Sequence, residues 1–190
     1  MGEKLKVIGT EYNECLFRSR LEARWAVFFD SLGIDYDYEL EGYALHGEPK
    51  DLMYLPNFFL PRIGVHAEVK PHLSTISDSD IQKIITFASD SEMQLLLIVG
   101  TPLKYRMHFL DSCNIENYRS ICDPKNIKEF GSLSIAFQYA VECNPDVDFS
   151  IRPQTGFWDI SYTQHSDYHD YCYKTAIKKA MQARFEHKSH

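Results

Sequence analysis

Apolar residues recur at helical spacing in the first part of the chain. Their period predicts a helix over residues 17–32, ended by the glycine at position 33. Ser19 and Glu22 have the spacing of a capping box, but they fall inside this predicted helix, so we give the motif little weight. The apolar stripe of the helix consists of Leu21, Trp25, Phe28, Phe29 and Leu32.

The next segments predict strands and one crossover helix. Acids and aromatics alternate over residues 34–43, as in a half-exposed strand. Residues 54–60 and 65–70 form two further predicted strands, joined by the four-residue connection 61–64 as a hairpin. A capped helix over 77–89 and a continuous apolar run at 93–99, typical of a strand covered on both faces, follow. These elements predict an α/β core in residues 1–110.

The remainder, residues 111–190, is expected to be an extension of that core. It predicts a helix over 133–143, a strand over 157–162 and a final helix over 167–187 with one apolar side. That apolar side is expected to pack on the core, so that the chain forms one structural domain overall.

Composition narrows the class of protein. With 44% hydrophobic and 25% charged residues among 190, the chain is neither disordered nor fibrous. No apolar run approaches the ~18 residues of a membrane span, and the start lacks an apolar signal region, so we expect no membrane partner and a cytoplasmic location. The five cysteines form no C-x-x-C pair and are expected to be reduced.

Candidate chemistry appears on the 65–70 strand, where Glu68 and Lys70 share a face with His66. If the hairpin pairs Leu60 with Val65, residue 57, an asparagine, lies opposite Glu68. Glu22 falls on the rim of the apolar stripe of the first helix, where a carboxylate is expected to meet a cation or an arginine.

Glu22, Pro56-Asn57 and Glu68-Val69-Lys70 together resemble the PD-(D/E)xK nuclease superfamily. The segments beginning at Phe17, Tyr54, His66 and Ala180 are similar to phage and bacterial nucleases of this type, so the resemblance covers most of the chain. It implies a restriction-endonuclease-like mixed β-sheet core flanked by helices, with a C-terminal helical extension. It also implies Mg²⁺- or Mn²⁺-dependent hydrolysis of DNA phosphodiester bonds, leaving a 5′-phosphate.

The resemblance assigns roles to these residues. Glu68, the carbonyl of Val69 and Glu22 would bind the metal, and Lys70 would orient or deprotonate the attacking water. The family's second metal ligand is an aspartate, but this chain has Asn57 there, and a neutral amide weakens the binding of Mg²⁺. Either an inactivating substitution has been introduced, the reading we favour slightly, or the protein is naturally impaired.

Several basic residues are candidates for contact with the DNA backbone. The alternatives are an ion pair with Glu22 or with the acidic segment 35–51 for the arginines, a sheet-surface role for the histidine and a solvated helix face for the lysines. The candidates are Arg18, Arg20, Arg24, His66, Lys174 and Lys178.

A separate zinc site is a minor hypothesis. His165, His169 and Cys172 would share one helical face, with Cys143 or Asp159 as a fourth ligand.

Two rival functions remain open beside an endonuclease. The first rival is a catalytically inactive DNA-binding member of the same fold. The second rival is a protein-interaction role, such as a phage-encoded inhibitor that uses the acidic 35–51 surface as a nucleic-acid mimic. In the phage case it would work in the host cytoplasm. A homodimer is a further expectation, because nucleases that cut both strands often act as two-fold dimers.

Overall fold

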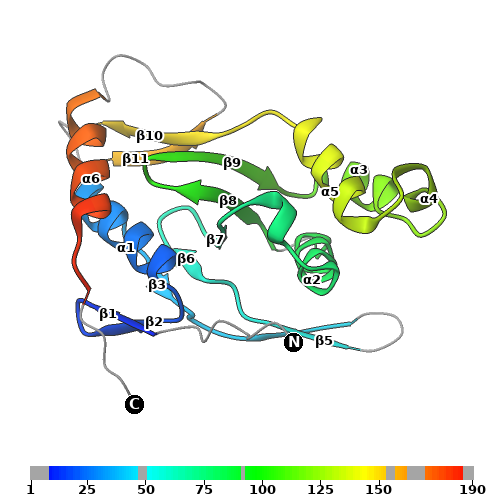
Figure 1. Cartoon of the computed structure of the whole chain (residues 1–190), viewed down its shortest axis with the longest axis horizontal. Coiled ribbons are helices and arrows are strands. Elements are labelled where there is room, and N and C mark those ends of the chain that lie inside the picture. The colour runs from blue at the N-terminus through cyan, green and yellow to red at the C-terminus, as the bar shows by residue number, and fades with distance from the viewer. Residues whose placement is uncertain (1–8, 47–50, 91–92, 153–156, 162–169, 186–190) are drawn as a thin grey trace, which may run out of the picture.

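A five-stranded mixed sheet forms the centre of the molecule (Figure 1). The computed structural model describes residues 9–46, 51–90, 93–152, 157–161 and 170–185. The strand order is β3-β6-β7-β8-β9, and β7 and β8 run parallel while the other neighbours are antiparallel. The predicted mixed α/β class is therefore confirmed. The five strands are β3 (Asp37–Tyr38), β6 (Phe58–Leu60), β7 (Val65–Lys70), β8 (Leu95–Thr101) and β9 (Lys104–Leu110).

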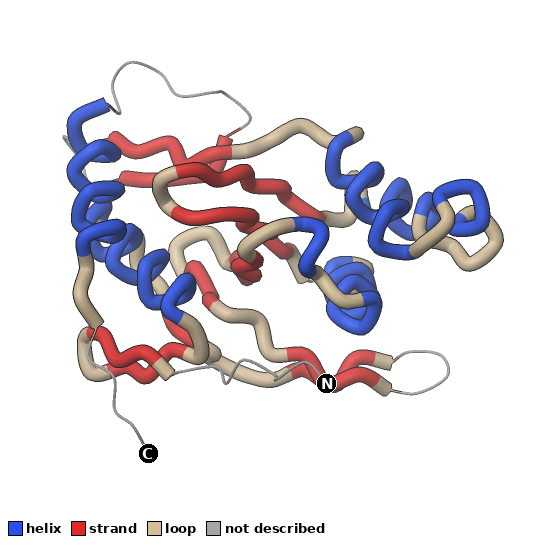
Figure 2. Tube along the Cα trace, in the orientation of Figure 1, coloured by secondary structure: helices blue, strands red, loops and turns tan. Residues whose placement is uncertain are grey.

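Helices cover both faces of the sheet (Figure 2). On one face α1 (Arg20–Leu32) lies beside α6 (Asp170–Gln182); on the other lie α2 (Asp78–Ala88) and α5 (Leu133–Glu142). Alternate side chains of β7 point to opposite faces of the sheet. Val65, Ala67 and Val69 join the core under α1, whereas His66 contacts Phe87 of α2.

The first helix begins at Arg20, three residues later than its apolar period suggested. Ser19 is the N-cap, and its hydroxyl accepts a hydrogen bond from the backbone N–H of Glu22. The preceding residues form a hairpin of β1 (Thr10–Tyr12) and β2 (Cys15–Phe17). The discounted capping box was therefore the correct marker of the helix start.

The predicted strands over 34–43 and 54–60 are each broken in two. The first divides into β3 and β4 (Tyr43–Leu45), and the second has β5 (Leu52–Tyr54) at its start and β6 at its end. Glu39 adopts a φ of 48°, which ends β3. Pro56 stands between β5 and β6, where the absence of an N–H prevents continued pairing.

The hairpin, the crossover helix and the buried strand agree with the sequence patterns. Leu60 pairs with Val65, as predicted, and Gly64 supplies the positive φ of 66° in the connection. Ser77 caps α2, and its hydroxyl accepts from the N–H of Asp80. Because α2 links two parallel strands, the end of β7 and the start of α2 come together.

Residues after 110 complete both cores, as the predicted packing requires. The expected helix and strand correspond to α5 and to β11 (Phe157–Ser161). Phe149 and Trp158 join the core under α1, while Phe137 and Val141 join the core under α2. Elements that were not predicted from the sequence are β9, the 3-10 turn η1 (Leu73–Thr75), α3 (Ile115–Ile121), α4 (Ile127–Phe130) and β10 (Asp148–Arg152).

The final helix ends at Gln182, before the predicted end at residue 187, while residues 167–169 and 186–187 of the predicted range lie outside the described residues. Tyr173, Ala176 and Ala180 are its buried residues, and they pack towards α1. Among the helices in the described ranges, none has the length and apolar character needed to cross a membrane.

Candidate functional site

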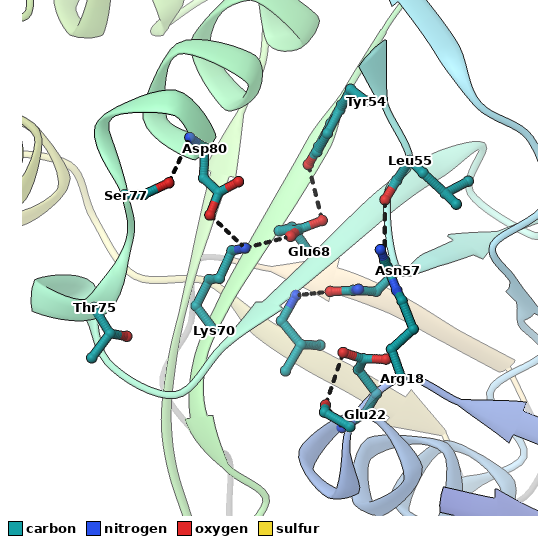
Figure 3. A network of polar contacts seen from close by, with 12 residues as sticks. Arg18, Glu22, Tyr54, Leu55, Asn57, Glu68, Lys70, Thr75, Ser77 and Asp80 are labelled. Atoms are coloured by element: carbon teal, nitrogen blue, oxygen red, sulfur yellow. Dashed lines mark hydrogen bonds and ion pairs between the residues drawn. The ribbon is translucent and has the colours of Figure 1, made fainter. Parts of the chain in front are cut away.

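The residues that carry the nuclease resemblance lie together in one cavity of about 710 Å³ (Figure 3). Glu22 comes from α1, Asn57 from the segment before β6, and Glu68, Val69 and Lys70 from β7. Arg18, Asp80 and Lys83 line the same cavity. The chain thus brings three carboxylates, one carboxamide and three cationic side chains to one place.

Glu22 is held at the N-terminus of α1 by two hydroxyl groups. The hydroxyl of Ser19 donates to Oε1 over 2.8 Å, and that of Tyr38 donates to Oε2 over 2.6 Å. The side chain is buried, and both of these hydrogen bonds come from hydroxyls. The expected arginine is nearby, because Arg18 lines the same cavity and the Glu22 carboxylate helps to raise its pKa. A carboxylate at this end of a helix also interacts favourably with the helix dipole.

Asn57 is fixed by its side chain and its backbone. Its Oδ1 accepts a hydrogen bond of 2.7 Å from the backbone N–H of Val69, and its carbonyl accepts one of 3.0 Å from Glu39. This hydrogen bond fixes the orientation of the amide, with Oδ1 towards Val69 and Nδ2 away from that N–H. An aspartate in the same place would offer a second oxygen there instead of an N–H donor.

The buried Glu68 and the half-buried Lys70 form an ion pair. Lys70 Nζ lies 2.9 Å from Glu68 Oε1 and 3.5 Å from Asp80 Oδ2, so the ammonium stands between two carboxylates (Figure 3). The other oxygen of Glu68 accepts a 3.1 Å hydrogen bond from the hydroxyl of the buried Tyr54. A charged pair with this many partners is tolerated in the protein interior.

Burial and charge act against each other on this pair. Burial raises the pKa of Glu68, although the nearby Lys70 opposes that shift. Burial lowers the pKa of Lys70, but the carboxylates of Glu68 and Asp80 outweigh it, so that the pKa lies above its usual value. Lys70 is therefore a cation at neutral pH in this arrangement. Tyr54, buried beside Glu68, also has a raised pKa.

The cavity offers oxygen donors of the kind that a hard cation prefers, namely the carboxylates of Glu22 and Glu68, and Val69 also lines it. These donor types fit Mg²⁺ or Mn²⁺. Because Asn57 is neutral, the cavity has one negative charge fewer than it would have with an aspartate at that position. Within the described residues no three acidic, histidine or cysteine side chains are arranged as a metal cluster. Each of the four oxygens of Glu22 and Glu68 has one partner already, so a bound ion would share these oxygens with Lys70 or a hydroxyl, or replace it.

The predicted DNA-contacting residues are not gathered at this cavity. Arg18 lines it and forms an ion pair with Glu39, a member of the acidic segment 35–51. Arg20 and Arg24 lie on α1 outside the lining, as do the exposed Lys174 and Lys178 on α6.

His66 is a core residue, neither a phosphate contact nor a sheet-surface side chain. Its ring is buried beside Phe59 and Phe87, and Nε2 lies 3.1 Å from the hydroxyl of Tyr43. Burial lowers the pKa of the ring, so its neutral form is favoured. The expected contact of His66 with DNA is therefore wrong for this arrangement.

The zinc hypothesis is not addressed by the structure, because His165 and His169 lie outside the described residues. Cys172 is an exposed free cysteine on α6, and Cys143 is exposed at the end of α5.

The sequence patterns missed three side chains that organise the site. Tyr38 and Tyr54 hold the two glutamates, and Asp80 contacts Lys70. The signal for Asp80 was available, since it stands three residues after the helix cap Ser77 and the crossover brings the start of α2 to the end of β7. Nothing in the tyrosine spacing distinguished these two from the other ten in the chain.

No known protein family matches the chain, and neither the curated proteins nor the solved structures contain a matching relative.

Proposed function

We propose that the protein has the core of a metal-dependent nuclease that hydrolyses DNA phosphodiester bonds. One observation carries the proposal: Glu22, Asn57, Glu68, Val69 and Lys70 line a single cavity although they come from three separate segments of the chain. The mixed sheet with helices on both faces is compatible with a restriction-endonuclease-like fold, which is part of the same proposal.

In this proposal the carboxylates of Glu68 and Glu22, with the carbonyl of Val69, would hold Mg²⁺ or Mn²⁺. Such an ion lowers the pKa of water and offsets the negative charge that builds up on phosphorus oxygens. Lys70 points into the same cavity as a cation, suited to orienting the attacking water and to stabilising negative charge. Arg18 is placed to contact a flanking phosphate.

Asn57 is expected to limit catalysis in the chain as it stands. Its oxygen is shared with the N–H of Val69, and its amide group adds no negative charge to the cavity. Asn57→Asp preserves the acceptor for Val69 and adds a carboxylate oxygen, which favours metal binding. We expect cleavage to rise at least tenfold in this variant, by comparison with the usual effect of removing one group that stabilises a transition state.

The test is a cleavage assay on supercoiled plasmid, single-stranded circular DNA and a branched junction, each with Mg²⁺ and with Mn²⁺. Four proteins are compared: the chain as written, Asn57→Asp, Asn57→Asp with Glu68→Ala, and Asn57→Asp with Glu116→Ala. Glu116 is an exposed acid on α3 that lies outside the cavity lining, so the last protein is a matched control. We expect cleavage from Asn57→Asp and from the control only.

A second candidate is a DNA-binding protein without catalysis, favoured by the neutral Asn57 in the cavity. It predicts that all four proteins bind DNA and that none cuts it. If none cuts and none binds, the nuclease proposal and this alternative are both wrong. Retained cleavage in the Glu68→Ala protein would also contradict the proposed site.

A further inference from the structure

Two exposed apolar side chains stand at the mouth of the cavity. Leu16 on β2 is 59% exposed and Met53 on β5 is 66% exposed, and both line the cavity that contains Glu68 and Lys70. Single exposed apolar residues are common on protein surfaces. These two differ because they come from separate hairpins and meet at the same charged cavity.

Their position follows from one contact between the hairpins. Arg18 Nη2 lies 3.5 Å from the carbonyl oxygen of Leu55. Leu16 stands two residues before Arg18, and Met53 two residues before Leu55. The two apolar side chains therefore lie close to the contact by which Arg18 connects the strand pair β1–β2 to the strand pair β4–β5.

Leu16 is also supported from behind. A side chain at Gly9 would have its Cβ only 3.1 Å from Leu16 Cδ1, so the glycine backbone packs directly against the leucine. Leu16 is therefore an exposed side chain with a fixed support, which suits a contact surface.

The chemistry of the cavity mouth points to a nucleic acid with exposed bases. Arg18, Lys70 and Lys83 line the cavity and are the groups that would contact phosphate. Arg18 is also paired to Glu39, and Lys70 to Glu68 and Asp80. Leu16 and Met53 complement the apolar face of a base, and leucine and methionine are side chains that wedge against unstacked bases in other complexes. A regular duplex hides those faces by stacking, whereas an unpaired strand presents them.

We propose that the cavity receives an unpaired segment of DNA, with a base against Leu16 and Met53 and the adjoining phosphate near Arg18 and Lys70. The inference rests on the proposed function, because it names the substrate structure for the same site. Single-stranded DNA and the unpaired arm of a flap both present this feature, and an uninterrupted duplex does not.

The test uses the full chain as written, in which Asn57 limits cleavage, and measures binding by fluorescence anisotropy. The probes are a fluorescein-labelled single strand, the same sequence as a duplex, and that duplex with a single-stranded flap. We expect the single strand and the flap to bind about tenfold more tightly than the duplex. The double variant Leu16→Ser with Met53→Ser should reduce this preference to less than about twofold.

The matched control is Leu103→Ser with Ile135→Ser, which removes two apolar side chains of similar exposure away from the cavity. It should keep the preference for unpaired DNA. Thermal melts of both double variants check that each is folded. Arg18→Gln should weaken binding of all three probes together and reduce its dependence on salt.

Equal affinity for the three probes, no binding of any probe, or an unchanged preference in the folded Leu16→Ser, Met53→Ser protein would overturn the inference. These results are separate from the cleavage assay. If Asn57→Asp cuts duplex and single strand equally well, the nuclease proposal stands and this inference is wrong. If Asn57→Asp cuts nothing but the chain prefers unpaired DNA, the inference stands for a binding protein and the catalytic proposal is wrong.

Discussion

At the scale of single residues, Asn57 determines what the cavity can do. Its side chain is 3% exposed, and its oxygen supplies an acceptor that the buried N–H of Val69 requires. An aspartate would satisfy the same N–H but would place a further negative charge near Glu22 and Glu68. The hydrogen bond to Val69 can thus be made by either residue at position 57, whereas the charge of the cavity depends on which of the two is present.

That difference predicts a metal-dependent change in stability. Without divalent cations, Asn57→Asp should lower the melting temperature, because a third buried carboxylate repels the other two. Mn²⁺ or Mg²⁺ should raise the melting temperature of Asn57→Asp much more than that of the chain as written, by about 2.7 kcal/mol of stability at a hundredfold excess over the dissociation constant. Differential scanning fluorimetry with a cation titration measures both effects.

The control for this experiment is Asn57→Leu, which keeps the approximate size but removes the acceptor. It should cost about 1–3 kcal/mol, since the N–H of Val69 is left buried without a partner, and it should show no added response to the cations. If adding Mn²⁺ does not change the melting temperature of Asn57→Asp, the proposed metal site is wrong.

His108 on β9 is a second single residue that is expected to affect the stability of the protein, through its burial. It is fully buried, and its Nδ1 lies 3.2 Å from Asp146 Oδ1 without hydrogen-bond geometry, while Arg106 occupies both oxygens of that carboxylate. Burial lowers the pKa of His108 to about 4, although Asp146 opposes the shift. The folded protein therefore favours the neutral ring.

This lowered pKa predicts a loss of stability in acid. Above about pH 6.5 the ring is neutral in both states and contributes no pH dependence. As the pH falls from 6.5 towards 4, the unfolded chain takes up a proton that the folded chain excludes, and the free energy of unfolding decreases by up to about 3 kcal/mol. Urea unfolding at pH 8, 6 and 5 measures the slope.

His108→Leu should flatten this part of the pH profile and raise stability at pH 5 relative to the original chain. The exposed His72, changed to Gln, is the comparison, and it should leave the slope unchanged. An identical slope in His108→Leu would show that the acid sensitivity arises elsewhere.

At the scale of elements, the N-terminus of α1 joins folding to the site. The hydroxyl of Ser19 accepts from the N–H of Glu22 and donates to its carboxylate, so one side chain caps the helix and orients a candidate metal ligand. Tyr38 from β3 completes the arrangement.

Ser19→Ala should therefore affect both stability and activity. We expect a loss of about 1 kcal/mol from the missing cap. In the Asn57→Asp background it should also reduce cleavage several-fold, because Glu22 keeps only the Tyr38 contact. Ser132→Ala, which removes the equivalent cap of α5 outside the cavity lining, controls for the general effect of losing a helix cap.

The readout that separates the two roles is rescue by Ser19→Thr. Threonine has the same hydroxyl and should restore the cleavage rate as well as the stability. If Ser19→Ala and Ser132→Ala reduce cleavage equally, Ser19 acts only through general helix stability.

At the scale of the whole molecule, the last helix closes over the first. α6 packs on α1 (Figure 1), and its residues Ala176 and Ala180 are fully buried in the core. The hydroxyl of Tyr173 donates a 2.6 Å hydrogen bond to the carbonyl of Phe149 on β10, which ties the helix to the strand pair β10–β11. The C-terminal part is thus an integral side of the core.

Overpacking this contact should destabilise the entire molecule. Ala180→Phe is expected to cost about 1–3 kcal/mol or more, because no space exists for the ring between α6 and its neighbours. Lys179→Phe, at an exposed position on the next residue, should change stability by less than about 0.5 kcal/mol. Chemical denaturation followed by tryptophan fluorescence is suitable, since Trp25 lies in the same core.

A single unfolding transition is expected for both proteins. If Ala180→Phe instead produced a separate early transition, residues 111–190 would form an independent unit, contrary to the packing of α6 and α5 into the two cores.

The sequence alone was sufficient for features that depend on local order. The alternation along residues 65–70 specifies which side chains share a face, the four-residue connection sets the Leu60–Val65 register, and the apolar run after α2 becomes the parallel strand β8. It also selected Glu22, Asn57, Glu68, Val69 and Lys70, which the fold places in one cavity.

Tertiary structure decided everything that depends on distant partners. Residues Lys104 to Phe109 of β9 alternate polar and apolar, which is a strand pattern that the sequence prediction did not include, whereas only packing explains why His108 on the polar side is buried. The contact of His66 with Tyr43 and that of Glu22 with Tyr38 likewise depend on how separate elements pack. Periodicity reports which way a side chain faces along its own element, whereas the group it meets is determined by how the elements pack.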